Sequence, residues 1–402
     1  MVSVESYAQF GGIHWETGSL RNVLAHKGIH NPHTSQPFSE AMLFGLTGGV
    51  AVMYFMFEYE GYPPQLYIGT RYPFDPLDQA VERLGLVANV IETTSQKRAV
   101  DNLLSVLATG EPAIVWADMF QLRYNALPSG GFPGMQPIIV YGYNSDTGEI
   151  QIADRSLVPL TATTGELSAA RAAQGNLENR ILTVDAPQKG IKNLGRAIRG
   201  AIRACISLYT DKPPKGPSSN FGFKALEKWE DLIVNERKQK GWKKLFANRA
   251  QLYEALKSIY TQIEDAGSGG GASRPTYATF LDEAAEVLGK PALVEVAEQF
   301  QMAGEKWTEL AVAALPEEVE SLRETRELIL RRGQVFRAMG QVALPEMDQI
   351  AIRLNELRNE VGRSFPLSDD EVNDLLSDLQ ASIQRIQEAE ETAVKSLKKV
   401  VR

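Results

Sequence analysis

The stretch from Pro137 to Ala153, PIIVYGYNSDTGEIQIA, decides the fold class of the N-terminal half of this chain. Two runs rich in Ile, Val and Tyr flank Asn144 to Gly148, NSDTG, whose residues favour a tight turn between strands. The pattern therefore predicts an antiparallel pair of strands over Ile138 to Ala153.

Short β patterns and helical patterns surround this hairpin. Ile- and Val-rich runs lie at Ala113 to Ala117 and at Arg180 to Val184. Amphipathic helix patterns precede them at Thr17 to His26, Pro76 to Gly85 and Ala99 to Thr109. Helices first and antiparallel strands later predict an α+β layer rather than a doubly wound sheet.

The most apolar stretch of the chain runs from Met42 to Phe57 and is bracketed by Glu40 and Glu58. It is shorter than the ~20 residues that a membrane span needs, and it contains several glycines. We therefore expect a buried helix end, a glycine turn and a central strand.

The second half of the chain has only helical patterns. A helix with an apolar face from Leu194 to Tyr209 is followed by Thr210 to Gly222, which is rich in Pro, Gly and Ser. We predict an N-terminal domain over 1–190, a helix and linker over 191–222, and an all-α domain over 223–402.

The last helix has a clear predicted start and a long apolar face. Ser368 and Glu371 form a capping-box pattern, and apolar residues then recur near 4-3 spacing as far as Val400. Two alternatives follow: the helix packs on its own bundle, or it joins a second copy and makes a homo-oligomer.

Composition limits the classes of partner. The 402 residues carry a net charge of −8, so no overall positive field attracts nucleic acid or an anionic membrane. A single cysteine, Cys205, excludes an intrachain disulfide, and Met1 to Phe10 lacks the pattern of a signal peptide. We expect a cytoplasmic protein with no nucleic-acid or membrane partner and no cofactor.

The N-terminal half has the layout of a cysteine-hydrolase site. Such a site needs a nucleophile at a helix start, a histidine on a strand and a third group that orients the histidine. Trp15 lies at the start of the first helix, with Gln9 six residues before it. Gln136 precedes one strand of the hairpin and Asp154 ends the other.

Three segments carry a resemblance to a known family, namely GIHWETGSLRNVLAHKG (12–28), SEAMLFGLTGGVAVMYF (39–55) and GMQPIIVYGYNSDTGEIQIADRS (134–156). They resemble the N-terminal domain of the butirosin-biosynthesis protein BtrH family and, more distantly, bacteriocin-processing papain-like cysteine peptidases. KGWKKLF (240–246), the segment 267–285 and Trp307 resemble the helical domain that follows in that family. The resemblance implies a papain-like fold and transfer of an acyl group from a carrier thioester to an amine.

The chain departs from the family at both reactive positions. Where the resemblance places the cysteine, this chain has Trp15, and where it places the base histidine, it has Gln136. An indole is no nucleophile and an amide accepts no proton near pH 7. Asp154 keeps its place without an imidazole to orient. The predicted site therefore contains His14, Trp15, Glu16, Gln136 and Asp154.

Other groups offer alternative chemistry. His14 with Thr17 or Ser19 could form a displaced base and nucleophile, although Glu16 and Thr17 also suit a helix start. Cys205 lies on an apolar helix face, which favours a buried thiol.

Two loops also carry candidate residues. The loop from Gly267 to Gly271 is either a substrate clamp, with Gly270 and Arg274 beside an anion, or an ordinary connection. With Gln9 and Thr17, these are the predicted substrate-binding residues. The loop with His26, His30 and His33 could hold zinc or nickel or be a solvated turn; we predict no metal.

Two functions follow from the sequence. The first is a ligand-binding or scaffolding pseudoenzyme that holds a small-molecule, peptide or acyl-carrier-bound ligand. The second is an acyltransferase or amidase with a displaced nucleophile or a non-covalent mechanism.

Overall fold

The computed structural model describes residues 2–127, 134–173 and 179–401. The chain divides into two compact units, and each unit is built from three segments. Unit 1 consists of Met1–Leu43, Val81–Leu194 and Arg331–Ile352. Unit 2 consists of Phe44–Ala80, Gly195–Leu330 and Arg353–Arg402.

Unit 1 is built on an antiparallel sheet, in which the described residues supply seven strands. The order is β4-β9-β5-β6-β7-β8, and β1 pairs with the later part of β6. The strand bounds are β1 Val2–Ser3, β4 Val87–Ile91, β5 Ala113–Asp118, β6 Met135–Asn144, β7 Glu149–Ala153, β8 Leu160–Thr163 and β9 Ile181–Asp185.

The predicted hairpin is confirmed. Strands β6 and β7 pair from Asn144 opposite Glu149 to Ile139 opposite Ala153. Strands β5 and β9 also lie where the sequence predicts them. The sequence analysis missed β4, whose residues are mostly exposed, and the four-residue β8, because neither has a strong apolar alternation.

Helices cover the sheet of unit 1. Helix α1 lies against β6, and the Ser19 hydroxyl donates to the Pro137 carbonyl over 3.2 Å. Helices α4 and α5 contact β5. The helices that contribute to unit 1 are α1 Trp15–His26, α2 Glu40–Thr47, α3 Pro76–Leu84, α4 Gln96–Ala108, η1 Arg123–Asn125, α5 Thr164–Ala172, α12 Glu320–Met339, η6 Gly340–Ala343 and α13 Leu344–Arg363.

Unit 2 combines a β-hairpin with a set of helices. The hairpin joins β2 Val50–Phe57 to β3 Gln65–Arg71. Apart from Leu194, the helices that lie entirely in this unit are α6 Leu194–Thr210, η3 Ser218–Asn220, α7 Gly222–Val234, α8 Trp242–Leu245, α9 Arg249–Tyr260, η4 Thr261–Asp265, η5 Gly271–Ser273, α10 Arg274–Leu288, α11 Ala292–Ala314 and α14 Asp369–Val401. The prediction of an α+β N-terminal part followed by a long helical region is confirmed.

The apolar run from Met42 to Phe57 forms a helix end, a glycine turn and a strand, as predicted. Gly48 and Gly49 have φ of 119° and 69°, a region that suits glycine. The expectation of a central strand is wrong, because within the described residues β2 pairs along its length only with β3. Helix α7 covers β2, and the Gln262 amide bonds the β3 backbone at Leu66 and Ile68, so helices replace further strands.

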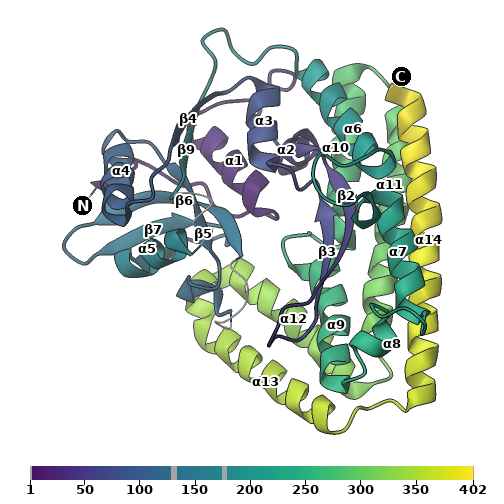
Figure 1. The fold of residues 1–402 in the computed structure, drawn as a ribbon. Coiled ribbons are helices and arrows are strands. Elements are labelled where there is room, and N and C mark those ends of the chain that lie inside the picture. The colour runs from purple at the N-terminus through teal and green to yellow at the C-terminus, as the bar shows by residue number, and fades with distance from the viewer. Residues whose placement is uncertain (1, 128–133, 174–178, 402) are drawn as a thin grey trace. The chain divides into compact units, whose positions relative to one another are not determined.

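Helix α14 packs its apolar face against α7 and α11, and Figure 1 shows it in yellow alongside them. This is the intrachain alternative of the sequence analysis. Leu379 and Ile386, on that face, are fully buried. The predicted capping box is also confirmed, because the Ser368 N–H donates to the Glu371 carboxylate and the Glu371 N–H donates to the Ser368 hydroxyl.

Candidate functional site

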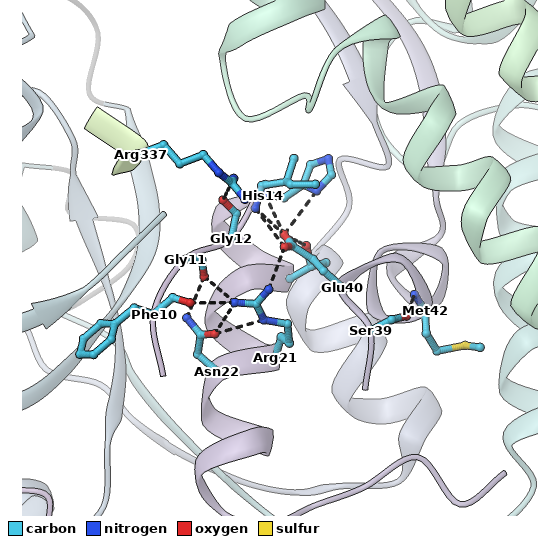
Figure 2. Close-up of polar contacts among 12 residues, drawn as sticks. Phe10, Gly11, Gly12, His14, Arg21, Asn22, Ser39, Glu40, Met42 and Arg337 are labelled. Carbon is cyan, nitrogen blue, oxygen red and sulfur yellow. Dashed lines mark hydrogen bonds and ion pairs between the residues drawn. The ribbon is translucent and has the colours of Figure 1, made fainter. Parts of the chain in front are cut away.

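The start of α1 is held by a buried carboxylate from the start of α2. Glu40 accepts hydrogen bonds from the Ile13 N–H at 2.9 and 3.0 Å, from the His14 N–H at 2.8 Å and from the Thr17 hydroxyl at 3.1 Å. Its Oε2 lies 3.7 Å from Nη1 of Arg21. Figure 2 shows these groups around Glu40. An internal anion therefore occupies the end of α1 that favours negative charge.

The charge on Glu40 is strongly stabilised. Burial acts to raise its pKa, but the nearby His14 side chain and the backbone N–H donors of His14 and Ile13 outweigh burial. These interactions bring the pKa of Glu40 to about 2. His14 is itself buried, with Nδ1 3.7 Å from Oε1 of Glu40. The predicted base thus lies beside a permanent anion.

Two glycines allow this close packing. A Cβ placed on Gly12 would lie 2.9 Å from the Cα of Gly18, and one on Gly18 would lie 3.6 Å from Oε1 of Glu40. Any side chain at Gly12 would therefore push the α1 backbone away from the Glu40 carboxylate.

Trp15 lies at the first position of α1, where the resemblance places a cysteine. Its side chain is 5% exposed. The guanidinium carbon of Arg155 lies 4.0 Å from the centre of the Trp15 ring and 5.0 Å from that of Phe336. The cation is thus held against two aromatic side chains, an arrangement that stabilises it when water is excluded.

Asp154 is the third group of the predicted site, and it contacts Arg155. Its Oδ1 accepts from the Arg155 backbone N–H at 2.7 Å and lies 3.4 Å from Arg155 Nε. Its Oδ2 accepts from the Tyr124 hydroxyl at 3.4 Å. Burial, and then the Asp154 charge, raise the pKa of Tyr124 well above its usual value. The Asp154 carboxylate, which would orient a catalytic histidine, therefore contacts Arg155 and Tyr124 instead.

Gln136 lies in β6, opposite Ala117 of β5, and is half-buried. Since Ile139 pairs with Ala153, the register brings Ile138 opposite Asp154, so Gln136 is two residues away on the same face of the sheet. The next residue, Pro137, bonds Ser19 of α1. The structure therefore brings Gln136 and Asp154 to neighbouring strands beside α1.

The remaining predicted residues fall into two groups. Gln9 and Glu16 are half-buried in unit 1, and Glu16 lies in the first turn of α1. Gly270 and Arg274 belong to unit 2. Arg274 is fully buried and bonds Nε to Glu390 at 2.6 Å. The structure thus does not bring Arg274 to a solvent-facing loop.

The loop before Arg274 is tied to its own surroundings. The Ser268 hydroxyl donates to Ile263 O at 2.6 Å and accepts from the Gly270 N–H at 3.1 Å. The Gly271 N–H donates to Glu264 Oε1 at 3.2 Å. These contacts match an ordinary, well-fixed connection between helices, which is one of the two alternatives for this loop.

Four side chains that shape the site were not predicted from the sequence: Glu40, Tyr124, Arg155 and Phe336. Only Arg155 carried a local signal, because it directly follows Asp154. The others reach the site through the fold.

Three further observations concern the cysteine, metal ligands and membrane spans. Cys205 is buried, its Sγ donates to Val50 O at 3.4 Å, and burial raises its pKa to about 12. Across residues 2–127, 134–173 and 179–401, no three His, Cys, Asp or Glu side chains gather as a metal site. No helix in these ranges is both long and apolar enough to cross a membrane.

The fold and the site thus define a mixed α+β domain with a Trp–Arg contact at the start of α1. Residues 14–155 match the family described as Butirosin biosynthesis protein H, N-terminal, and residues 165–330 match a domain of unknown function (DUF4872). The chain therefore carries a domain of the butirosin-biosynthesis protein H family followed by this second domain, which confirms the resemblance. None of the curated proteins matches the chain.

Proposed function

We propose that this chain is a papain-like pseudoenzyme of the butirosin-biosynthesis protein H family, which binds an acyl, peptide or amine ligand without covalent catalysis. The observation that carries the proposal is the contact of Asp154 with Arg155, whose guanidinium stacks on Trp15 at 4.0 Å. Arg155 thus contacts both Asp154 and the residue at the position where the resemblance places the cysteine. A guanidinium does not take up a proton near pH 7.

The hydroxyl groups near α1 support the same proposal. Thr17 donates to Glu40 and Ser19 donates to the Pro137 carbonyl. Neither bond leads to a group that accepts a proton near pH 7, because the Glu40 carboxylate has a pKa of about 2. The acyltransferase alternative would need His14 as the base for a Ser or Thr nucleophile, whereas these two hydroxyls donate to other groups.

The proposal extends to organisation and partners. We place the papain-like domain at 1–190, the linker at 191–222 and the helical domain at 223–402. The ligand is a small molecule, a peptide or an acyl group on a carrier, in the cytoplasm. An association of two copies through the last helix would have to use its exposed side, because Leu379 and Ile386 are buried.

Turnover tests this proposal. The protein is incubated with a panel of acyl thioesters and amines, and amide formation is followed beside His14→Ala, Glu16→Ala and a control, Glu5→Ala, at an exposed carboxylate. We expect the rate with wild-type protein to equal the rate without protein. Amide formation that is lost in His14→Ala and kept in Glu5→Ala would instead establish the acyltransferase alternative.

A further inference from the structure

Two arginines of unit 1 are fixed beside the start of α1. Arg155 stacks between Trp15 and Phe336, at 4.0 and 5.0 Å. Arg337 donates from Nη1 to the Gly12 carbonyl at 3.1 Å, as Figure 2 shows. The two residues come from a loop after β7 and from α12, so the fold brings them to one helix end.

Main-chain hydrogen bonds connect the segments around these arginines. The Gly11 N–H donates to Ser156 O at 2.8 Å, and the Leu157 N–H donates to Arg337 O at 2.8 Å. The segments that carry Gly12, Arg155 and Arg337 are thus fixed to one another by main-chain bonds. Because these segments are already fixed, ligand binding loses little conformational entropy in ordering them.

The arginines near this helix end differ in their ion pairs, and Glu16 in the first turn of α1 adds a further carboxylate. Arg155 contacts the buried carboxylate of Asp154, but among the described residues no carboxylate pairs with Arg337. Glu40 lies at the same helix end and is already engaged with Arg21, His14 and the backbone. One guanidinium is therefore left without an ion-pair partner among the described residues.

The Arg155 side chain keeps donors available. Its Nε faces Asp154 and its Nη2 donates to Asn125 Oδ1 at 3.3 Å, while its side chain stays 19% exposed. The rings of Trp15 and Phe336 contact the guanidinium group, so its solvent-accessible part is the edge that carries the N–H groups. The edge of a guanidinium is the part that bonds carboxylate and phosphate oxygens in pairs.

We propose that Arg155 and Arg337 form a binding site for an oxyanion, the carboxylate or phosphate group of the ligand. This inference rests on the proposed function and names the chemistry of the bound ligand. Arg155 supplies guanidinium N–H donors in a fixed orientation, and Arg337 supplies a positive charge that no carboxylate pairs with among the described residues. Two guanidinium groups favour an anionic group over an amine at this position.

The test is a binding titration with inorganic phosphate and, separately, with acetate, each at constant ionic strength set with potassium chloride. Tryptophan fluorescence is the main signal, because Trp15 lies under Arg155, and the shift of the melting temperature is the second. We expect saturable binding in at least one arm, and the arm that binds more tightly identifies phosphate or carboxylate as the preferred group.

The variants assign the site. Arg155→Gln and Arg337→Gln should each weaken binding about ten-fold or more, the size of one lost charge-assisted hydrogen bond. Arg331→Gln is the matched control, because Arg331 lies on the same helix and pairs with Glu346. Arg155→Lys keeps the charge without the guanidinium N–H donors and should bind at an intermediate level if Arg155→Gln does not fold.

Two results would overturn the inference: no saturable binding in either arm, or an equal loss in Arg331→Gln. Each of these two binding results can be distinguished from a failure of the proposed function, which is measured as amide formation. Amide formation by a protein that still binds phosphate would remove the pseudoenzyme proposal and leave the oxyanion site in place.

Discussion

Arg155 in unit 1 and Arg274 in unit 2 each contact a carboxylate, but they do so in opposite settings. Arg274 is fully buried and its hydrogen bonds use every N–H of the guanidinium. Arg155 is partly exposed and shares its carboxylate with a phenol and a backbone N–H. An arginine–carboxylate pair thus stabilises the core of unit 2, whereas in unit 1 such a pair leaves N–H donors of the arginine available.

The surroundings of Arg274 explain its role. Its partner Glu390 also accepts from Tyr209 at 2.7 Å and from Trp307 at 2.8 Å. The remaining donors of Arg274 bond the carbonyls of Thr70, Ala51 and Ala272 and the Tyr209 hydroxyl. This network ties the β2–β3 hairpin to helices α6, α10, α11 and α14. A fully satisfied buried network specifies one packing arrangement.

Glu390→Gln should have the largest effect on stability. Removing its charge leaves the buried Arg274 cation without a counter-ion, which costs about 3 to 5 kcal/mol. Urea unfolding followed by circular dichroism measures the loss. Glu388→Gln, at an exposed position of the same helix, should change the free energy of unfolding by less than about 0.5 kcal/mol. Equal effects would contradict the role assigned to Glu390.

Glu40→Gln should rank second and should alter the pH dependence. Because the pKa of Glu40 falls from 4.5 to about 2 on folding, its charge adds about 3 kcal/mol above pH 4.5. That contribution is lost as the pH falls from 4.5 towards 2. Unfolding at each pH should show a smaller acid-induced loss in the variant, and parallel wild-type and variant curves would exclude this carboxylate as the cause.

Arg155→Gln should cost less, about 1 to 2 kcal/mol, because Asp154 keeps the bonds from the backbone and from Tyr124 and the Arg155 side chain is partly exposed. Arg274→Gln in unit 2 should cost about 3 to 5 kcal/mol. Measuring both variants by urea unfolding compares the two arginines directly. A larger loss for Arg155→Gln would show that its role is mainly structural.

Ser368→Ala should have the smallest effect and sets the scale for an exposed contact. It removes the capping box of α14, the helix that carries Glu390, at a cost of about 0.5 to 1 kcal/mol. Thermal unfolding can resolve such a change. A loss as large as that of Glu390→Gln would mean that the helix start, rather than the buried network, limits the stability of unit 2.

Features with a local signal could be predicted from the sequence. The β6–β7 hairpin follows from its turn residues, and the start of α14 follows from Ser368 and Glu371, three positions apart. In both cases the interacting groups are close along the chain. Their pairing therefore needs no knowledge of the tertiary fold.

The site contacts could not be predicted in this way, because their partners are remote in sequence. Arg337 reaches Gly12 across 325 positions, and Glu40 reaches Ile13 across 27. The position of β2 was also set by helices rather than by strands. The substitutions at Trp15 and Gln136 were visible from the sequence, but the arginine that contacts the indole was not.

Intact-protein mass spectrometry after incubation with an acyl thioester tests the central claim most directly. We expect no acyl adduct on the wild-type chain, because Trp15 cannot attack and the hydroxyls of Thr17 and Ser19 donate to the Glu40 carboxylate and the Pro137 carbonyl rather than to an imidazole. A stoichiometric acyl adduct that maps to residues 12–28 would contradict it.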